Sequence, residues 1–588
     1  MKIVIILSIL LTFSQAEVIE LKPIEVTASS LSDAKEESLI PPNEEVETVV
    51  VIQETVPGFE NPVVNGLMGD KVLLTVDGIK FSNSLFRSGP NQYYSWIPKE
   101  FTTKAELNSN LSGITSSALG GAINRELGID ESVVGVSADF TDHKEYIKYK
   151  DKKVSFGLLN DNRQNVTTPK GTIEHSAYNQ HGAYFEHKDE ELGQTKLVFT
   201  QSNDVDRTDK FEKGEYYVYD LQQYFLLSHK YYIPDTDLVI LPSFQQFKEK
   251  IDRNSPTNKD TDSTNNMFGI QLLGYYEPSW TDDGYFSYGV VNNFEDIEYE
   301  SGLVTNNYNY NTLSLYTTYH TSYKKLDYDL KYKYSVMTAR GGGLDRTLDN
   351  HSVGIDSKYR LGYRHSIFAG ANLNYKFPTI TNLAEARDDS VTEIANPNLK
   401  QERAYTLTLG YNFEYFTTSI FHKKLYDMII REETNIPDGS GAFKWKYQNT
   451  DEGYINGVNV KYDRKFSNGF GVFLFAEYLD GKTDYDYISK LVPFHTKSKV
   501  SYKPFYAELL YAPSVSDNKM AEKDKQDIRI KDHNYGYRII NIGYERTFKK
   551  VHDIGIQLDN VLDETGRVYG SSVDFGERGL YFTYQYHY

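Results

Sequence analysis

The sequence predicts an all-β membrane protein, a β-barrel whose antiparallel strands cross the bilayer. Three observations predict it. From about residue 131 onward, segments of roughly ten residues alternate in polarity and are separated by turn residues. The last nine residues, Leu580–Tyr588, alternate in the same way. The chain also holds 49 Tyr and 31 Phe but only 3 Trp, and tyrosine suits a membrane interface, where its ring is buried and its hydroxyl stays wet.

Residues 1–16 have the pattern of a secretory signal peptide. Lys2 supplies the positively charged N-terminal region, and Ile3–Phe13 is an apolar core. Ser14-Gln15-Ala16 places small residues at the two positions that signal peptidase recognises. The apolar run is shorter than the ~20 residues that a membrane-spanning helix needs. We therefore expect cleavage after Ala16 and export of the mature chain.

Residues 17–38 form a polar segment poor in aromatic side chains, expected to be extended or disordered in isolation. Within it, the residues at 23–29 read PIEVTAS, with β-branched side chains at three positions that suit a strand. A plain linker is the alternative interpretation of this segment.

The next region, residues 39–128, contains the signals of a small folded domain. Val72–Val76 is a short apolar run that predicts a buried strand. Asp77-Gly78 closes it with a tight turn, because glycine tolerates the positive φ that such a turn requires. Gly120-Gly121 marks another turn before Ala122–Asn124.

Residues 129–588 carry the repeated alternating segments. In the clearest of them, Ala404–Phe413, Tyr405, Leu407, Leu409, Tyr411 and Phe413 are predicted to face lipid, and the residues between them the lumen. A count of such segments gives about 22. Polar stretches such as 161–176, 202–216, 377–400 and 515–533 are predicted to be extracellular loops, with the short turns on the periplasmic side.

Several of these stretches resemble the TonB-dependent outer-membrane receptors of bacteria. Val64–Gly128 resembles the plug domain of that family, Lys376–Leu399 resembles a loop that ends in Asn-Pro-Asn-Leu, and Asn560–Tyr588 resembles the last hairpin. The resemblance implies a barrel of 22 strands with an N-terminal α+β plug in its lumen, located in the bacterial outer membrane. Only Ser30–Thr55 separates the segment at 23–29 from Val56-Pro57-Gly58, a shorter stretch than the family usually has, so the plug is expected to be shortened.

The resemblance also assigns roles to the two ends of the mature chain. The segment at 23–29 resembles a TonB box, which pairs as an added strand with the periplasmic protein TonB; its residues are Pro23, Ile24, Glu25, Val26, Thr27, Ala28 and Ser29. The terminal strand resembles the signal read by the barrel assembly machinery, carried by Phe582, Tyr584, Tyr586 and Tyr588. Partners are therefore TonB, the assembly machinery and outer-membrane lipid, and the chain is expected to be a monomer.

Two segments are candidates for ligand binding. In the plug apex, Arg87 is suited to a carboxylate, Asn91 and Gln92 to ligand amides or oxygens, and Tyr93, Tyr94 and Trp96 to stacking on a flat ligand. The alternative is that these side chains pack within the plug. In the loop 377–400, Arg387, Asp388 and Asp389 are further candidates, and the acidic residues there disfavour a strongly anionic ligand.

The expected function is import of a scarce ligand, with a ferric siderophore as first choice because it is the commonest cargo of the family. Haem, cobalamin or another metal chelate is the alternative, although no histidine lies between Phe377 and Asn396 to ligate haem iron. No resident cofactor or metal site is expected.

Other classes of function are disfavoured by the sequence. A passive porin needs neither a TonB box nor a plug, an enzyme needs a catalytic motif that is not recognisable here, and a surface adhesin is left open by the long loops. Zero Cys excludes disulfides and thiolate chemistry, and a net charge of −19 argues against a nucleic-acid partner.

Overall fold

A computed structural model describes residues 43–44, 49–85, 93–108, 118–139, 141–210, 215–252, 260–280, 284–301, 304–384, 393–437, 443–531 and 533–588. All of them belong to one compact unit, Ser38–Tyr588, of the two into which the chain divides. Among the described residues, no helix is both long enough and apolar enough to cross a membrane.

A closed barrel of 22 strands is the main element of this unit, and neighbouring strands pair antiparallel. The number of strands and the antiparallel pairing confirm the prediction. The strands are β8 (Val133–Ala138), β9 (His143–Lys150), β10 (Val154–Arg163), β13 (Tyr178–Asp189), β14 (Gly193–Lys210), β15 (Glu215–Tyr232), β16 (Leu238–Asp252), β17 (Thr261–Tyr276), β18 (Tyr285–Ser301), β19 (Val304–Tyr323), β20 (Leu326–Gly341), β21 (Leu344–Gly362), β22 (His365–Lys376), β24 (Glu402–Phe413), β25 (Phe416–Tyr426), β28 (Glu452–Lys465), β29 (Phe470–Thr483), β30 (Phe494–Tyr502), β31 (Phe505–Ala512), β32 (Tyr537–Phe548), β33 (His552–Asp559) and β34 (Gly579–His587).

Alternation of side chains decides which face of each strand meets lipid. In β24, Tyr405, Leu407 and Leu409 are exposed on the outer face, whereas Thr406 and Thr408 are buried against the interior. The outward side chains of a barrel in a membrane contact lipid, so this exposure places apolar groups where lipid is. The predicted orientation of this strand is confirmed.

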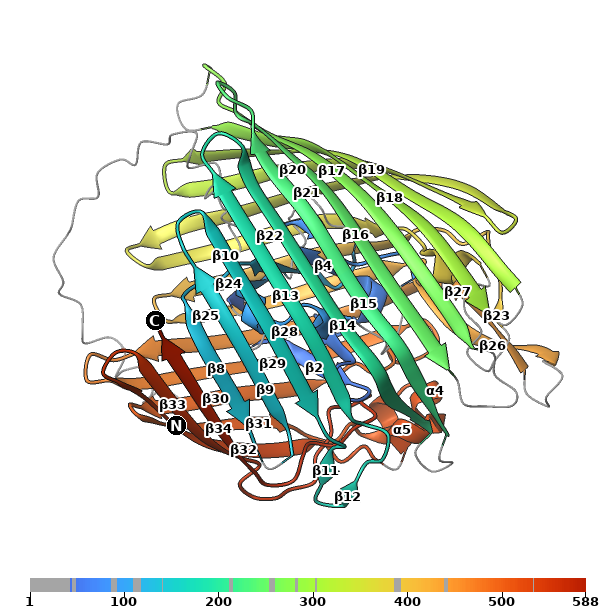
Figure 1. Cartoon of the computed structure of the whole chain (residues 1–588). Coiled ribbons are helices and arrows are strands. Elements are labelled where there is room, and N and C mark those ends of the chain that lie inside the picture. The colour runs from blue at the N-terminus through green and yellow to red at the C-terminus, as the bar shows by residue number, and fades with distance from the viewer. Residues whose placement is uncertain are drawn as a thin grey trace, which may run out of the picture. The chain divides into compact units, whose positions relative to one another are not determined.

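The predicted extracellular loop at 202–216 is wrong for most of its length. Strand β14 runs on to Lys210 and β15 begins at Glu215, so the wall on this side is built of strands of 18 residues. Figure 1 shows β14 and β15 running on beside each other in this part of the wall. Where strands extend beyond the bilayer, both faces can be polar, and polarity no longer marks the end of the strand.

Connections differ in length at the two ends of the barrel. One end has short turns, such as that between Tyr323 and Leu326, and the other has long connections, such as that between Lys376 and Glu402. The long connections contain β11 (Thr167–Thr168), β12 (Gly171–Thr172), α3 (Ile380–Leu383), β23 (Glu393–Ile394), β26 (Ile429–Pro437), β27 (Phe443–Asn449), α4 (Glu522–Gln526) and α5 (Ile528–Lys531). We call these ends the short-turn end and the long-loop end.

An inner domain occupies the lumen, and Figure 1 shows its strands β2 and β4 inside the ring of barrel strands. Its five-stranded sheet has the order β1 (Asn43–Glu44), β6 (Thr102–Asn108), β7 (Gly121–Leu127), β4 (Val72–Val76), β5 (Ile79–Lys80). A separate hairpin joins β2 (Val51–Glu54) to β3 (Glu60–Val63). We call this inner domain the plug.

The predicted strand and turn of the plug are both present. All five residues of β4 are buried, and Asp77 and Gly78 have φ values of 51° and 75° in the turn to β5. Asp77 also accepts a hydrogen bond from the Leu127 amide at 2.9 Å, which ties the turn to the end of β7. The turn therefore fixes the two central strands of the sheet to each other.

The last strand, β34, closes the barrel by pairing with β8 from Phe582 opposite Ala138 to His587 opposite Val133. Phe582, Tyr586 and Tyr588 are exposed on the outer face, and the Tyr588 hydroxyl donates to the Lys148 carbonyl at 3.0 Å. Tyr586 and Tyr588 thus lie where the first and last strands meet, at the short-turn end.

We expect Tyr588→Ser to slow insertion into the outer membrane, because an aromatic end on the terminal strand is the feature that the assembly machinery reads in the proposed role. The measurement is the amount of heat-modifiable, folded barrel in outer-membrane fractions over time after induction. Tyr588→Phe, which keeps the ring and removes the hydroxyl, is the control and should insert as the wild type does. Equal folded levels of Tyr588→Ser and wild type would contradict the assembly signal.

Candidate functional site

Many of the predicted site residues lie outside the described residues. These are the TonB-box segment 23–29, Arg87, Asn91 and Gln92 of the plug apex, and Arg387, Asp388 and Asp389 of the loop. Their roles stay predictions. The structure describes the chain on both sides of residues 86–92 and 385–392. It also describes the other three apex candidates, Tyr93, Tyr94 and Trp96.

Tyr93, Tyr94 and Trp96 are buried in the largest apolar cluster that the described residues form. The ring centroids of Tyr93 and Trp96 are 4.4 Å apart, and the Arg125 guanidinium lies 4.7 Å from the Tyr94 ring. Trp96 also stacks on Phe247 of the barrel wall, at 6.2 Å. In this structure the three side chains join the plug to the wall, and a ligand could stack on them only if this packing opened.

The two candidate segments converge where they leave the described structure. The Thr381 amide of α3 donates to the Ser84 carbonyl at 3.2 Å, and the Thr381 hydroxyl donates to the Leu85 carbonyl at 3.1 Å. Leu85 packs against the cluster formed by Phe377, Ile380 and Leu383. The apex 86–92 and the loop segment 385–392 therefore start from neighbouring points inside the barrel.

The apex base is also tied to the wall. Glu295 of β18 accepts hydrogen bonds from the Ser84 amide at 2.8 Å and the Ser84 hydroxyl at 2.7 Å, and pairs with Lys80 at 3.2 Å. Its side chain is fully buried, so these charged and neutral donors replace the water that a buried carboxylate needs. The base of the apex is thus held from two sides, by a wall strand and by the inward-folded loop.

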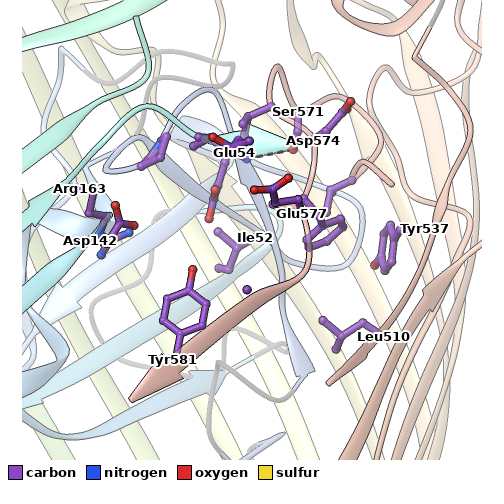
Figure 2. Close-up of a pocket in the computed structure, with 18 of the residues that line it drawn as sticks. Ile52, Glu54, Asp142, Arg163, Leu510, Tyr537, Ser571, Asp574, Glu577 and Tyr581 are labelled. Carbon is purple, nitrogen blue, oxygen red and sulfur yellow. Dashed lines mark hydrogen bonds between the residues drawn. The ribbon is translucent and has the colours of Figure 1, made fainter. Parts of the chain in front are cut away.

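A cavity of about 500 Å³ lies elsewhere, between β2 of the plug and the wall at the long-loop end (Figure 2). Its size is in the range of small-molecule sites. The lining holds five carboxylates against three permanently charged bases: Glu54, Asp139, Asp142, Asp574 and Glu577 against Arg163, Lys497 and Arg578. Asp574 is also paired with the buried Arg567, so the remaining excess of negative charge is small and disfavours a strongly anionic occupant.

Glu54 has the most strongly shifted pKa among the carboxyl groups of this cavity. Burial, with Glu60 nearby, raises the pKa of Glu54 to about 7, although Arg163 opposes the shift. Its backbone is fixed to the loop between β33 and β34, since its amide donates to the Ser571 hydroxyl at 3.0 Å and its carbonyl accepts from the Ser572 amide at 2.9 Å. Figure 2 shows Glu54 beside Ser571 in the cavity.

This shift predicts a local pH dependence. The pKa of Glu54 is higher in the folded protein than in the unfolded chain, so ionisation destabilises the β2–β3 hairpin as the pH rises from 4.5 through about 7. We expect Glu54→Gln to slow hydrogen exchange of the hairpin amides relative to wild type at pH 8. At pH 5, where Glu54 is protonated, the two proteins should exchange alike once the rates are corrected for intrinsic chemistry. A difference of the same size at both pH values would contradict the role of ionisation.

A buried group of four charged side chains, not predicted from the sequence, joins the plug to the wall. Lys376 at the end of β22 pairs with Asp70 of the plug at 2.9 Å and with Glu402 at the start of β24 at 3.0 Å. Glu402 also pairs with Lys71 of the plug, and it accepts from the Ile429 amide at 2.8 Å. We call Asp70, Lys71, Lys376 and Glu402 the charge cluster. Two acids and two bases are balanced in it, and all four are nearly inaccessible to solvent.

A signal for the charge cluster was present in the sequence. Asp70-Lys71 precedes the apolar run of β4 directly, and charged residues beside a buried strand require partners. The partners themselves are more than 300 positions away in the chain, so the sequence could indicate a need for them without identifying them. Within the described part of the chain, no group of three or more His, Cys, Asp and Glu side chains is arranged to hold a metal ion.

Comparison with solved structures finds the same fold in proteins of low sequence identity. The copper transporter OprC superposes with a TM-score of 0.75 at 11% identity, over 93% of this chain and 95% of that one. The hemophore receptor HasR of Serratia marcescens, in complex with its hemophore HasA and heme, gives 0.71 at 11% identity over 90% and 93%. The siderophore receptor PiuA of Acinetobacter baumannii gives 0.67 at 11% identity over 92% and 95%.

Comparison of the sequence itself identifies the family. No match was found among curated proteins. A family model described as "TonB dependent receptor-like, beta-barrel" matches residues 139–561, which is most of the chain and nearly all of the barrel. Barrels of this family are outer-membrane proteins, which agrees with the outward apolar faces of the strands. The chain belongs to the TonB-dependent receptor family.

Proposed function

We propose that this receptor imports a scarce ligand by energised opening of the plug, and does not act as a passive channel. The observation that carries the proposal is the charge cluster. Four buried charges hold the plug to β22 and β24, so the lumen is occupied by a domain that is fixed to the wall. A domain held in this way requires work to move, and a TonB box at 23–29 is the segment on which that work would act.

The ligand that we propose is an iron chelate, with a ferric siderophore as first choice. Support comes from the family and from solved structures of the same fold, which are named as a copper transporter, a hemophore receptor in complex with its hemophore and heme, and a siderophore receptor. The candidate binding surface combines Arg87, Asn91 and Gln92 with Arg387, Asp388 and Asp389, because both segments leave the described structure from one place. The acidic cavity near Glu54 supports a ligand that is not strongly anionic.

Three partners complete the proposal. TonB would pair with Pro23–Ser29 in the periplasm, and the barrel assembly machinery would read the terminal strand, β34. The receptor would act as a monomer in outer-membrane lipid, since a single chain closes the barrel and places the plug inside it.

Native mass spectrometry of receptor purified from iron-starved cells tests the ligand. We expect an added mass that carries iron, lost on treatment with a competing iron chelator. In Arg87→Ala, binding of the same compound should weaken by about 1–3 kcal/mol if Arg87 is a desolvated anchor. Lys99→Ala, at an exposed plug position outside the candidate residues 87–96, is the control and should bind normally. A bound compound without iron would overturn the iron-chelate assignment, and an unchanged affinity in Arg87→Ala would move the site to other loops.

A further inference from the structure

The turns at the short-turn end divide into an acidic arc and a basic arc. Three adjacent turns, between β13 and β14, β15 and β16, and β17 and β18, carry carboxylates: Asp189, Glu190, Glu191, Asp235, Asp237 and Glu277. Most of the remaining turns carry lysine or arginine. The exposed members are Lys324, Lys325, Arg364, Lys465, Lys503, Lys549, Lys550, Lys152 and Lys153. The barrel order makes each set nearly continuous, with Asp151 and Glu414 as acids within the basic turns.

Four of these basic residues have a left-handed backbone conformation, which other residue types adopt more easily. Lys324, Arg364, Lys549 and Lys550 have φ values of 57°, 60°, 49° and 63°. Glycine and asparagine adopt this left-handed conformation at the least steric cost, and tight hairpin turns favour them for that reason. Four basic residues occupy such positions in three turns of one arc, and Glu414 of the same arc has a φ of 45°.

Aromatic rings contact several basic side chains at this end of the barrel, and these rings indicate where the basic groups lie relative to the membrane. The Lys324 ammonium lies 5.1 Å from the centroid of Tyr323, and the guanidinium groups of Arg364 and Arg546 lie 4.9 Å from the rings of Tyr363 and Phe548. Tyr323 and Tyr363 are 64% and 82% exposed. Tyrosine exposed at the end of a barrel strand belongs at the membrane interface, so the adjoining cations lie at the level of the lipid headgroups.

Other partners of these cations are few within the described structure. Arg364 reaches Glu414 at 3.6 Å, and both side chains are substantially exposed, so this pair contributes little. The lysines at 324, 325, 549 and 550 are exposed. A row of cations at headgroup depth attracts phosphate, and the phosphates available at this depth are those of the phospholipid leaflet.

We propose that the basic arc, defined as Lys324, Lys325, Arg364, Lys549 and Lys550 with their neighbouring turns, binds anionic phospholipid headgroups of the periplasmic leaflet. Phosphatidylglycerol and cardiolipin carry the net negative charge that this surface fits. The acidic arc, on the opposite part of the rim, repels the same lipids. The lipid shell of the receptor is therefore uneven around the barrel, whatever ligand the receptor imports.

The test is native mass spectrometry of the mature full-length receptor released from nanodiscs of phosphatidylethanolamine with one-fifth phosphatidylglycerol. In the arc variant, Lys324, Lys325, Arg364, Lys549 and Lys550 are all replaced by Gln. We expect the preference for retained phosphatidylglycerol over phosphatidylethanolamine to fall by on the order of tenfold. The preference of the wild type should also weaken at 0.5 M salt, because exposed charges are then screened.

Two controls separate charge from other effects. The first control has the same change in net charge at the long-loop end and should keep the wild-type preference. In it, Gln replaces Lys400, Lys444, Lys446, Lys519 and Lys525. A charge-preserving variant of the arc, with Lys and Arg exchanged at the same five positions, should keep most of it. Heat-modifiable migration checks that each barrel is folded.

The proposal is overturned if the arc variant retains phosphatidylglycerol as the wild type does. It is also overturned if the long-loop variant loses the preference equally, since net charge alone would then explain it. Unchanged lipid retention, together with loss of binding to an acidic periplasmic protein, would assign the arc to a protein partner instead.

Discussion

Glu402→Ala is expected to loosen the plug by about 3–5 kcal/mol, the penalty for leaving a buried charge without its partner. Lys71 and Lys376 both pair with this carboxylate, so its removal leaves two buried ammonium groups with Asp70 as their remaining acid. The Ile429 amide also loses its acceptor. The measurement is the urea concentration at which purified receptor in a planar bilayer begins to pass a steady ionic current, which should fall markedly in the variant.

Two further variants show whether the buried charge is responsible. Glu414→Ala removes a carboxylate whose pair with Arg364 is largely exposed, and the urea threshold should stay at the wild-type value. Lys71→Met combined with Glu402→Leu removes one acid and one base together and leaves Asp70 paired with Lys376, so it should be much less harmful than Glu402→Ala. Equal thresholds for Glu402→Ala and Glu414→Ala would show that the charge cluster does not hold the plug.

The barrel could be predicted from the sequence because its signal is local and repeated. Each strand alternates between lipid and interior, and β24 follows that rule closely enough for single residues to be placed, whereas in β34 the rule breaks at Thr583, which is exposed, and Tyr584, which is half-buried. The ends of the longest strands could not be predicted in this way. In β14, residues 206–210 are all polar in the sequence, which predicts a loop, although the backbone stays paired with β15.

The site was less accessible to sequence reasoning because its contacts are made between distant parts of the chain. The aromatic residues Tyr93, Tyr94 and Trp96 were recognisable as a group, yet their composition suits both a stacked ligand and a packed interface. The structure places them in the interface with Phe247. The charge cluster and the contact of Thr381 with Ser84 join positions that only the closed barrel brings together.

Val26→Pro is expected to abolish uptake while leaving ligand binding intact. An added strand pairs through its backbone, and proline removes the amide donor and fixes φ, so the pairing of 23–29 with TonB should fail. The described plug and barrel contain none of the changed atoms, so the extracellular site should bind as before. Val26→Ile, which keeps both the amide and the preference for an extended backbone, is the matched control and should transport at the wild-type rate.

Uptake of radiolabelled ligand by whole cells, with and without a protonophore, tests energised import most directly. Cells with Val26→Pro should bind as much ligand at the surface as wild-type cells and accumulate none inside, and the protonophore should reduce wild-type uptake to the same level. Accumulation at the wild-type rate in the Val26→Pro strain, unaffected by the protonophore, would contradict energised import and identify the barrel as a channel.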